Sequence, residues 1–142
     1  PVGFDGPIEV ALADDVVGLY FVRSSGSLKS RIEVAQWWVK PLNTSEQQLR
    51  REALDCSLSS HEGRLRGREQ VWRSDPELFV VNGAHGSKYS HSFMRDGTRR
   101  VEWNVCLRYP EFVLMLVLQE PADFDESGLR EFQHVVDSVR YR

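Results

Sequence analysis

Lys88–Tyr109 reads KYSHSFMRDGTRRVEWNVCLRY, and this stretch decides the fold. Apolar and polar residues alternate on both sides of Asp96-Gly97, and an Asp-Gly pair between two such segments is a strong signal for a β-hairpin with a two-residue turn. With this pair at the centre of the turn, the facing residues are Arg95 and Thr98, Phe93 and Arg100, His91 and Glu102, and Tyr89 and Asn104. The sequence therefore predicts one long antiparallel hairpin with a defined register.

Further strands are expected on both sides of this hairpin. The segments before it are rich in β-branched and aromatic residues and end at turn-forming residues, the last of them followed by a loop at Gly83–Gly86. These strands are expected at Asp14–Arg23, Arg31–Val39, Leu65–Arg73 and Glu77–Asn82. After the hairpin, Phe112–Leu118 is apolar at every position, as in a strand that is covered on both faces.

Two helices complete the expected set of elements. The first begins at one of two capping boxes, Asn43 with Glu46 or Thr44 with Gln47. It is expected to end near Ser59 and Gly63. The second begins at Asp123 or Asp125, and its apolar stripe consists of Leu129, Phe132, Val135, Val136 and Val139.

The order of elements predicts the fold class. Two strands, a helix, a five-stranded meander and a final helix are typical of an α+β domain. We expect a single domain over residues 1–142, with residues 1–13 as an N-terminal arm. The expected architecture is a curved antiparallel β-sheet of about six to seven strands with two helices packed on it, similar to an α/β/α sandwich.

The composition excludes several classes of protein. With 41% apolar and 27% charged residues among 142, the chain falls within the range of globular domains. Its longest apolar run, Phe112–Leu118, is far shorter than the roughly 20 residues of a spanning helix, so no membrane span is expected. Residues 61–110 are basic, with 9 Lys and Arg against 6 Asp and Glu, but the net charge of −3 argues against nucleic acid as a partner.

The two cysteines, Cys56 and Cys106, lie on an expected helix and an expected strand, without the spacing of a metal site. Either two buried thiols or one bridge fits, and buried thiols are the expectation. The chain does not begin with the basic and apolar regions of a signal peptide, so a cytoplasmic location is expected, or an exported one if a signal has been removed. Since no metal, cofactor or catalytic motif is recognisable, we expect no cofactor and a non-enzymatic role.

The hairpin register divides the side chains between two faces. Ser90, Ser92, Val101 and Trp103 combine small and large residues, which suits a face packed against a helix. The other face is polar and aromatic, and aromatic and arginine side chains are enriched at binding sites. We therefore predict a partner-binding surface made of Tyr89, His91, Phe93, Arg100, Glu102, Asn104 and Arg108, with Arg66 and Arg68 nearby on the preceding strand.

Other interpretations fit the same residues. The face is a solvated sheet surface with one contact between His91 and Glu102, or these two residues form a catalytic dyad for which no nucleophile is placed. Arg64, Arg66 and Arg68 are expected on a strand, with all three side chains on one side, which fits either an anionic partner or the charged protection of a sheet edge.

The C-terminal residues 101–142 follow a distinct pattern, in which a strand leads through a Pro-containing loop into a helix that ends with an apolar pair and a serine. The pattern is carried by Val101–Val105 (VEWNV), Tyr109–Glu111 (YPE), Phe112–Leu118 (FVLMLVL), Glu120–Phe124 (EPADF) and Phe132–Val139 (FQHVVDSV). It resembles the C-terminal half of the PsbP/DcrB/LpqN superfamily.

The resemblance implies a non-enzymatic α/β/α sandwich that serves as an adaptor. Members of this superfamily bind proteins, and they include photosystem subunits, a binder of a nuclear-transport GTPase, bacterial lipoproteins and cytoplasmic adaptors of type VI secretion effectors. No functional residue is carried over, because the superfamily has no shared catalytic motif.

Together these observations predict a protein-binding module of a bacterium, an adaptor, chaperone or immunity-type protein, that binds another protein through the polar and aromatic sheet face. A homodimer is a further option. The alternative is a small-ligand or lipid carrier, in which the sheet curls around an apolar pocket lined by Trp37, Tyr89 and Phe93.

Overall fold

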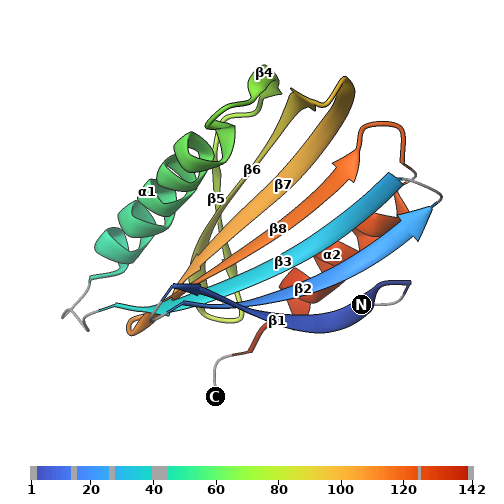
Figure 1. Cartoon of the computed structure of the whole chain (residues 1–142). Coiled ribbons are helices and arrows are strands. Elements are labelled where there is room, and N and C mark those ends of the chain that lie inside the picture. Colours follow the sequence, from blue (N-terminus) through green and yellow to red (C-terminus); the bar gives the residue numbers. More distant parts are fainter. Residues whose placement is uncertain (1–2, 14–15, 26–27, 40–44, 125, 141–142) are drawn as a thin grey trace.

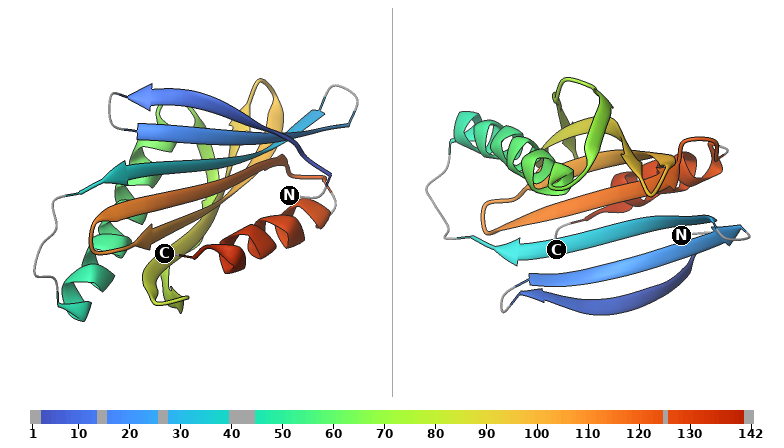
Figure 2. Two further views of the ribbon diagram at one scale, coloured as in Figure 1. Left: turned by 90° about the horizontal axis from the view of Figure 1, so that it is seen from below. Right: turned by 45° about the horizontal axis from the view of Figure 1, so that its top comes forward.

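The computed structural model describes residues 3–13, 16–25, 28–39, 45–124 and 126–140. They form an α+β structure in which helices α1 and α2 lie on opposite faces of an antiparallel sheet of eight strands (Figures 1 and 2), as the sequence predicts. The strands are β1 (Asp5–Ala13), β2 (Val16–Ser25), β3 (Leu28–Trp38), β4 (Glu69–Arg73), β5 (Glu77–Val81), β6 (Ala84–Arg95), β7 (Thr98–Arg108) and β8 (Phe112–Pro121), and the helices are α1 (Glu46–Leu65) and α2 (Ser127–Ser138).

The strand order in the sheet is β1-β2-β3-β8-β7-β6-β4, and β5 pairs with the other half of the same edge of β6. Between β6 and β7 the pairs are Arg95 with Thr98, Phe93 with Arg100, His91 with Glu102 and Tyr89 with Asn104. Asp96 and Gly97 form the turn with φ of 50° and 74°. The predicted hairpin and its register are therefore confirmed.

The prediction that residues 1–13 form an N-terminal arm is wrong for Asp5–Ala13, because these residues form the edge strand β1. Gly-Pro pairs such as Gly6-Pro7 are typical of loops. Here the pairing with β2 shifts register between Asp5 and Ile8, and Gly6 has a φ of 141°. An edge strand tolerates both a proline and such an irregularity, because one side of it has no ladder to complete. This strand raises the number in the sheet above the six to seven expected.

Other boundaries also differ from the prediction. Helix α2 begins at Ser127 rather than at Asp123 or Asp125. Helix α1 continues to Leu65 and β4 begins only at Glu69, with Gly67 at a φ of 73° between them. The run Arg64–Arg68 is therefore a helix end and a turn, so its arginines do not share one side of a strand as expected. The loop predicted at Gly83–Gly86 is also wrong.

That loop is replaced by a tight turn at Asn82 and Gly83, with φ of 47° and 82°, and β6 begins at Ala84. Asn-Gly is a preferred pair for this turn type because both of its central residues need positive φ. The amide nitrogen of Asn82 also donates to the carbonyl oxygens of Asp137 and Val139, at 3.0 and 2.8 Å. The turn thus satisfies backbone acceptors at the C-terminal end of α2.

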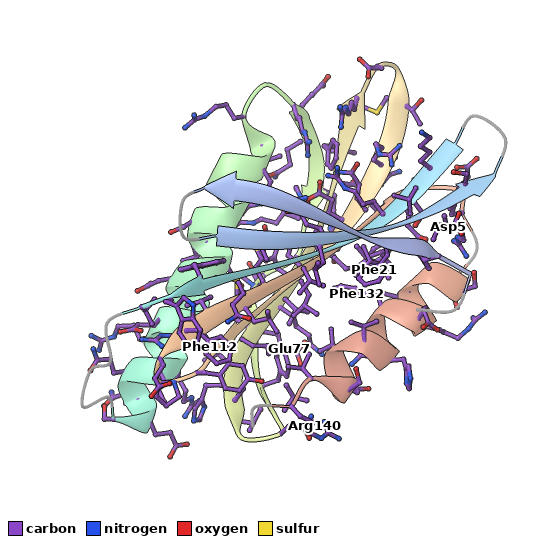
Figure 3. The ribbon with its side chains drawn as sticks, turned by 60° about the horizontal axis from the view of Figure 1, so that its bottom comes forward. Asp5, Phe21, Glu77, Phe112, Phe132 and Arg140 are labelled. Carbon is purple, nitrogen blue, oxygen red and sulfur yellow. A yellow bond between two sulfur atoms is a disulfide. The ribbon has the colours of Figure 1, made fainter. Side chains whose placement is uncertain are left out.

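The main apolar core lies between α2 and one face of the sheet. Phe132 and Val136 of α2 pack against Leu116 and Leu118 of β8 and Ile32 of β3. Figure 3 shows Phe132 turned toward the sheet on the side where Phe21 lies, and Phe21 packs against the same cluster. This face includes Trp103 and Val101, so the expectation that a helix packs on it is met over part of its width.

The N-terminal end of α2 is held by a buried carboxylate. Glu120 accepts from the hydroxyl of Ser30 at 2.7 Å and from the guanidinium of Arg23 at 2.9 Å, and Arg23 also donates to Ser127 at the start of α2. Gly128 follows, and a Cβ at this position would overlap the Glu120 carboxylate. The close approach of α2 to the sheet therefore needs glycine here.

Helix α1 covers the other face of the sheet over β6 and β7. Its N-cap is Ser45, whose hydroxyl accepts from the backbone NH of Gln48 at 3.2 Å. Asn43 and Thr44, the two N-caps expected from the sequence, lie outside the described residues. A disulfide between Cys56 of α1 and Cys106 of β7 ties the helix to the sheet, with the two Cα atoms 6.2 Å apart. The expectation of two buried thiols is wrong, because the two chain segments meet face to face.

Candidate functional site

The residues predicted to form an open partner-binding face lie beneath helix α1. Tyr89, His91, Phe93, Glu102, Asn104 and Arg108 are each at most 4% exposed. The hairpin register brings them to one face as predicted, but the expectation that this face is open is wrong. A polar side of α1 covers it, so that Ser57 bonds to Ser87 and Arg64 to Glu102 across the interface.

Glu102 is the centre of this buried polar layer. Its carboxylate accepts from Arg64 Nε at 2.5 Å, Arg68 Nη1 at 2.9 Å, Gln119 Nε2 at 2.5 Å and His91 Nε2 at 3.2 Å. Burial alone would raise the pKa of Glu102, but the hydrogen bonds from His91, Arg64 and Gln119 and the charge of Arg64 hold it well below its ordinary value. Glu102 is therefore an ionised structural group with its acceptor positions occupied.

An aromatic row crosses the same layer. His61 of α1 lies edge-on to both Tyr89 and His91, with ring centroids 5.3 and 5.0 Å apart, and His91 lies 5.4 Å from Phe93. Burial, followed by the charges of neighbouring basic groups, lowers the pKa of His61. The side chains of His91 and Glu102 are both completely buried, so a catalytic dyad here has no access for a substrate while α1 stays in place.

The four predicted arginines lie in different environments. Arg66 is exposed at the end of α1, whereas Arg68 stacks over the Phe93 ring at 4.5 Å from its centroid. Arg108 donates to Glu52 of α1 at 2.5 Å, and Arg100 lies outside the buried layer near the hairpin turn. These residues therefore do not form one surface.

The apolar pocket expected for a carrier is not formed by Trp37, Tyr89 and Phe93. Tyr89 and Phe93 are buried under α1, while Trp37 lines a separate hollow of about 340 Å³ with Cys56 and Met115. This placement corrects the predicted lining. Among the described residues, no group of three or more His, Cys, Asp or Glu side chains is arranged to hold a metal ion.

A groove of about 550 Å³ opens on the opposite face, between α2 and the connection from β4 to β5. It exists because α2 crosses the sheet obliquely: its start is held at Glu120, and its end is held at the Asn82 turn. The groove is lined by Ser74, Asp75, Glu77, Lys88, Tyr89, Ser90, Trp103, Asn104, Val105, Leu129, Arg130, Phe132 and Gln133. Its apolar lining consists of the partly exposed Trp103 and Leu129 and the buried Val105 and Phe132.

Exposed apolar side chains gather along the neighbouring sheet edge. Of the six large apolar residues that are most exposed in the described part of the chain, four lie on β4 and β5: Val71, Trp72, Leu78 and Val80. Trp72 pairs with Ser92, so by register it shares the face of the sheet on which the groove opens. We refer to Trp72 together with the groove residues Trp103, Leu129 and Phe132 as the Trp72–Trp103 surface.

Sequence reasoning missed this surface. The sequence predicts that Trp103 packs against a helix and that the last helix has an apolar stripe. It does not predict that a groove remains between this helix and the sheet. The available signal was the width of the sheet, because one helix of 12 residues does not cover the face of so many strands.

The fold belongs to the class of antiparallel sheets with one helix on each face. No protein-family model matches the chain, and no curated protein matches it in sequence. Among solved structures, LpqN of Mycobacterium tuberculosis, described as involved in cell envelope biogenesis, is similar with a TM-score of 0.61 and 15% identity, over 95% of this chain and 84% of LpqN. The protein PA94 of Pseudomonas aeruginosa, described as of unknown function, is similar with a TM-score of 0.60 and 14% identity, over 93% of this chain and 87% of PA94.

At these identities the comparisons show a shared fold. The likeness to the fold of LpqN covers 95% of this chain. No helix among the described residues is both long and apolar enough to cross a membrane.

Proposed function

We propose that this chain is a non-enzymatic, protein-binding module of a bacterium, and that its partner docks on the Trp72–Trp103 surface. The observation that carries the proposal is the exposure of Trp72 beside a groove with an apolar floor. Trp72 is 50% exposed and its neighbour Val71 is 49% exposed, which leaves a large apolar area uncovered on an edge strand. Tryptophan is among the residues that contribute most to protein interfaces.

The charged residues at the rim of the groove also favour a protein partner. Asp75 and Glu77 lie on one side and Arg130 on the other, and the ion pair between Lys88 and Glu77, at 3.7 Å, is exposed to solvent. Exposed pairs of this kind contribute little to stability and can exchange partners at little cost. An apolar centre with a polar rim is the usual anatomy of a protein interface.

The disulfide is relevant to the cellular compartment in which the protein functions. Bridges like that between Cys56 and Cys106 persist mainly in oxidising compartments, which favours the exported over the cytoplasmic alternative. A role as an adaptor, chaperone or immunity-type protein is compatible with this surface, and the two structural neighbours point to cell-envelope or regulatory proteins.

The test compares two exposed tryptophans. Trp72→Ser removes the side chain on the proposed surface, and Trp38→Ser is the matched control, since Trp38 is 64% exposed at the end of β3 and packs against Phe112 instead. The partner is captured on the wild-type chain, identified by mass spectrometry, purified and titrated calorimetrically. We expect Trp72→Ser to weaken its binding at least about tenfold and Trp38→Ser to leave it unchanged. Equal binding by both variants would overturn the assigned surface.

The groove also supports a second candidate, a small-ligand carrier, because about 550 Å³ is within the range of small-molecule sites. Native mass spectrometry of freshly purified protein distinguishes the two functions. A carrier retains a ligand that is lost when Leu129→Trp fills the groove and kept when Trp72→Ser alters only the exposed edge. A protein-binding module shows the mass of the chain alone or of a homodimer.

A further inference from the structure

Another hollow lies on the α1 face of the sheet, opposite to the groove, at the end where the β6–β7 turn lies. It has a volume of about 560 Å³ and is lined by residues of β2, β3, β6, β7 and β8 and of the Asp96-Gly97 turn. Its lining consists of Val22, Lys29, Arg31, Arg95, Asp96, Thr98, Arg100 and Gln119. By register, Val22, Arg31 and Gln119 share the face of Glu102, opposite to the Trp72–Trp103 surface.

The lining is strongly cationic. Four of its eight residues are Lys or Arg, against the single carboxylate of Asp96. That carboxylate is 93% exposed and lies 3.8 Å from Arg95, while Arg31 lies 3.5 Å from Glu33. The Arg95–Asp96 contact is long and exposed, so it neutralises the Arg95 charge weakly. The buried carboxylate of Glu33 is shared between Arg31 and Arg64, which lie 3.5 and 3.8 Å away. The hollow therefore keeps an excess of positive charge.

Arg100 is the group that this excess affects most. Its Nε donates to Gln119 Oε1 at 3.2 Å and its Nη2 donates to the carbonyl oxygen of Lys29 at 2.7 Å, so that the guanidinium is held by neutral acceptors. In the part of the chain that the structure describes, it makes no ion pair. Burial, followed by the charges of Arg95 and Arg31, lowers the pKa of Arg100, and the charge of Glu102 does not offset these effects.

We propose that this hollow binds a phosphate-bearing ligand through Arg100, Arg95, Arg31 and Lys29. A phosphate group carries close to two negative charges on oxygens that accept from several donors at once, whereas a carboxylate carries one. Guanidinium groups match that geometry better than ammonium groups, and two neutral contacts already orient the Arg100 guanidinium. Thr98 adds a hydroxyl donor to the same lining.

Calorimetric titration of the full chain with inorganic pyrophosphate tests the proposal, with sodium chloride at equal ionic strength and citrate as controls. We expect saturable binding of pyrophosphate that is weakened about tenfold or more by Arg100→Gln and by Arg95→Gln. Arg51→Gln is the matched control, because Arg51 is an exposed arginine of α1 that does not line the hollow. Circular dichroism checks that each variant is folded, and Arg95, with its side chain 52% exposed, can be replaced without loss of buried contacts.

Vesicles containing phosphatidic acid, whose headgroup is a phosphate monoester, form a second arm of the same experiment. Co-sedimentation that is lost on Arg100→Gln and competed by pyrophosphate supports a lipid headgroup as the source of the phosphate, whereas binding of pyrophosphate alone supports a free phosphate compound. The proposal is overturned if neither probe binds, if citrate binds as tightly as pyrophosphate, or if all three arginine variants bind alike. The hollow and the Trp72–Trp103 surface lie on opposite faces. Phosphate binding in the hollow and partner binding at the Trp72–Trp103 surface can therefore succeed or fail independently.

Discussion

His91 and Glu102 face each other across β6 and β7 with both side chains completely buried, and His91 Nε2 lies 3.2 Å from Glu102 Oε2. Two arginines and a glutamine complete the surroundings of the carboxylate. A buried charge destabilises the folded state when its partners are removed. The pair therefore belongs to the contact that holds α1 on the sheet.

Glu102→Gln is expected to reduce the free energy of unfolding by about 3 kcal/mol at neutral pH, because it leaves Arg64 and Arg68 beside a neutral amide. The folded state lowers the pKa of Glu102, so its contribution is present above the ordinary value of 4.5 and is lost as the pH falls below it. Urea denaturation at several pH values measures both effects. A variant whose stability falls with acid as steeply as that of the wild type would contradict this role.

His61 gives the fold a second dependence on pH, in a higher window. Its pKa is lowered in the folded state, so the fold favours the neutral imidazole. The resulting stability is present above the ordinary value of 6.5 and is lost as the pH falls below it. We expect His61→Gln to flatten the decline in unfolding free energy as the pH falls below 6.5, whereas His134→Gln, at an exposed site on α2, is the matched control. An unchanged slope in His61→Gln would exclude this assignment.

Two helical glycines should respond in opposite directions to replacement by alanine. A Cβ at Gly128 meets the Glu120 carboxylate, with Glu120 Cδ at 2.7 Å, so Gly128→Ala should destabilise the protein by about 1–3 kcal/mol. A Cβ at Gly63 of α1 meets nothing within 4 Å, so Gly63→Ala should stabilise it by about 0.5–1 kcal/mol through helix propensity. Thermal denaturation of the two variants compares them directly. Shifts of the same sign would show that the contact at Glu120 does not limit the approach of α2.

The bridge between Cys56 and Cys106 closes a sequence separation of 50 residues and ties α1 to β7. Replacing both cysteines by alanine should therefore lower the free energy of unfolding by about 2–5 kcal/mol. A reductant should lower the melting temperature of the wild type and leave that of the double variant unchanged. Titration of free thiols in the denatured, unreduced wild type is the control, and two thiols per chain would refute the bridge.

The hairpin register was predictable because its signals are local. Asp96-Gly97 specifies a turn with positive φ, and the alternation in Arg99–Tyr109 assigns each side chain to a face, so that His91 is placed opposite Glu102 without any tertiary information. The turn at Asn82-Gly83 has an equally local signal that was overlooked. Strand β1 was harder to predict, because Gly6-Pro7 carries a loop signal that an edge strand tolerates.

The sequence by itself determined the α+β class, the order of most elements, the pairing of β6 with β7 and the division of their side chains into two faces. Only the tertiary structure showed that helix α1 covers the polar face of the β6–β7 hairpin. Helix α1 brings His61 and Arg64 against Glu102, because a buried polar face can be satisfied by a polar helix as well as by water. The oblique path of α2 leaves Trp103 at the floor of a groove, and the sheet gathers Arg31, Arg95 and Arg100 around one hollow. The positions of these side chains depend on how elements that are far apart in the sequence pack in space. The alternation of apolar and polar residues within one strand does not contain this information.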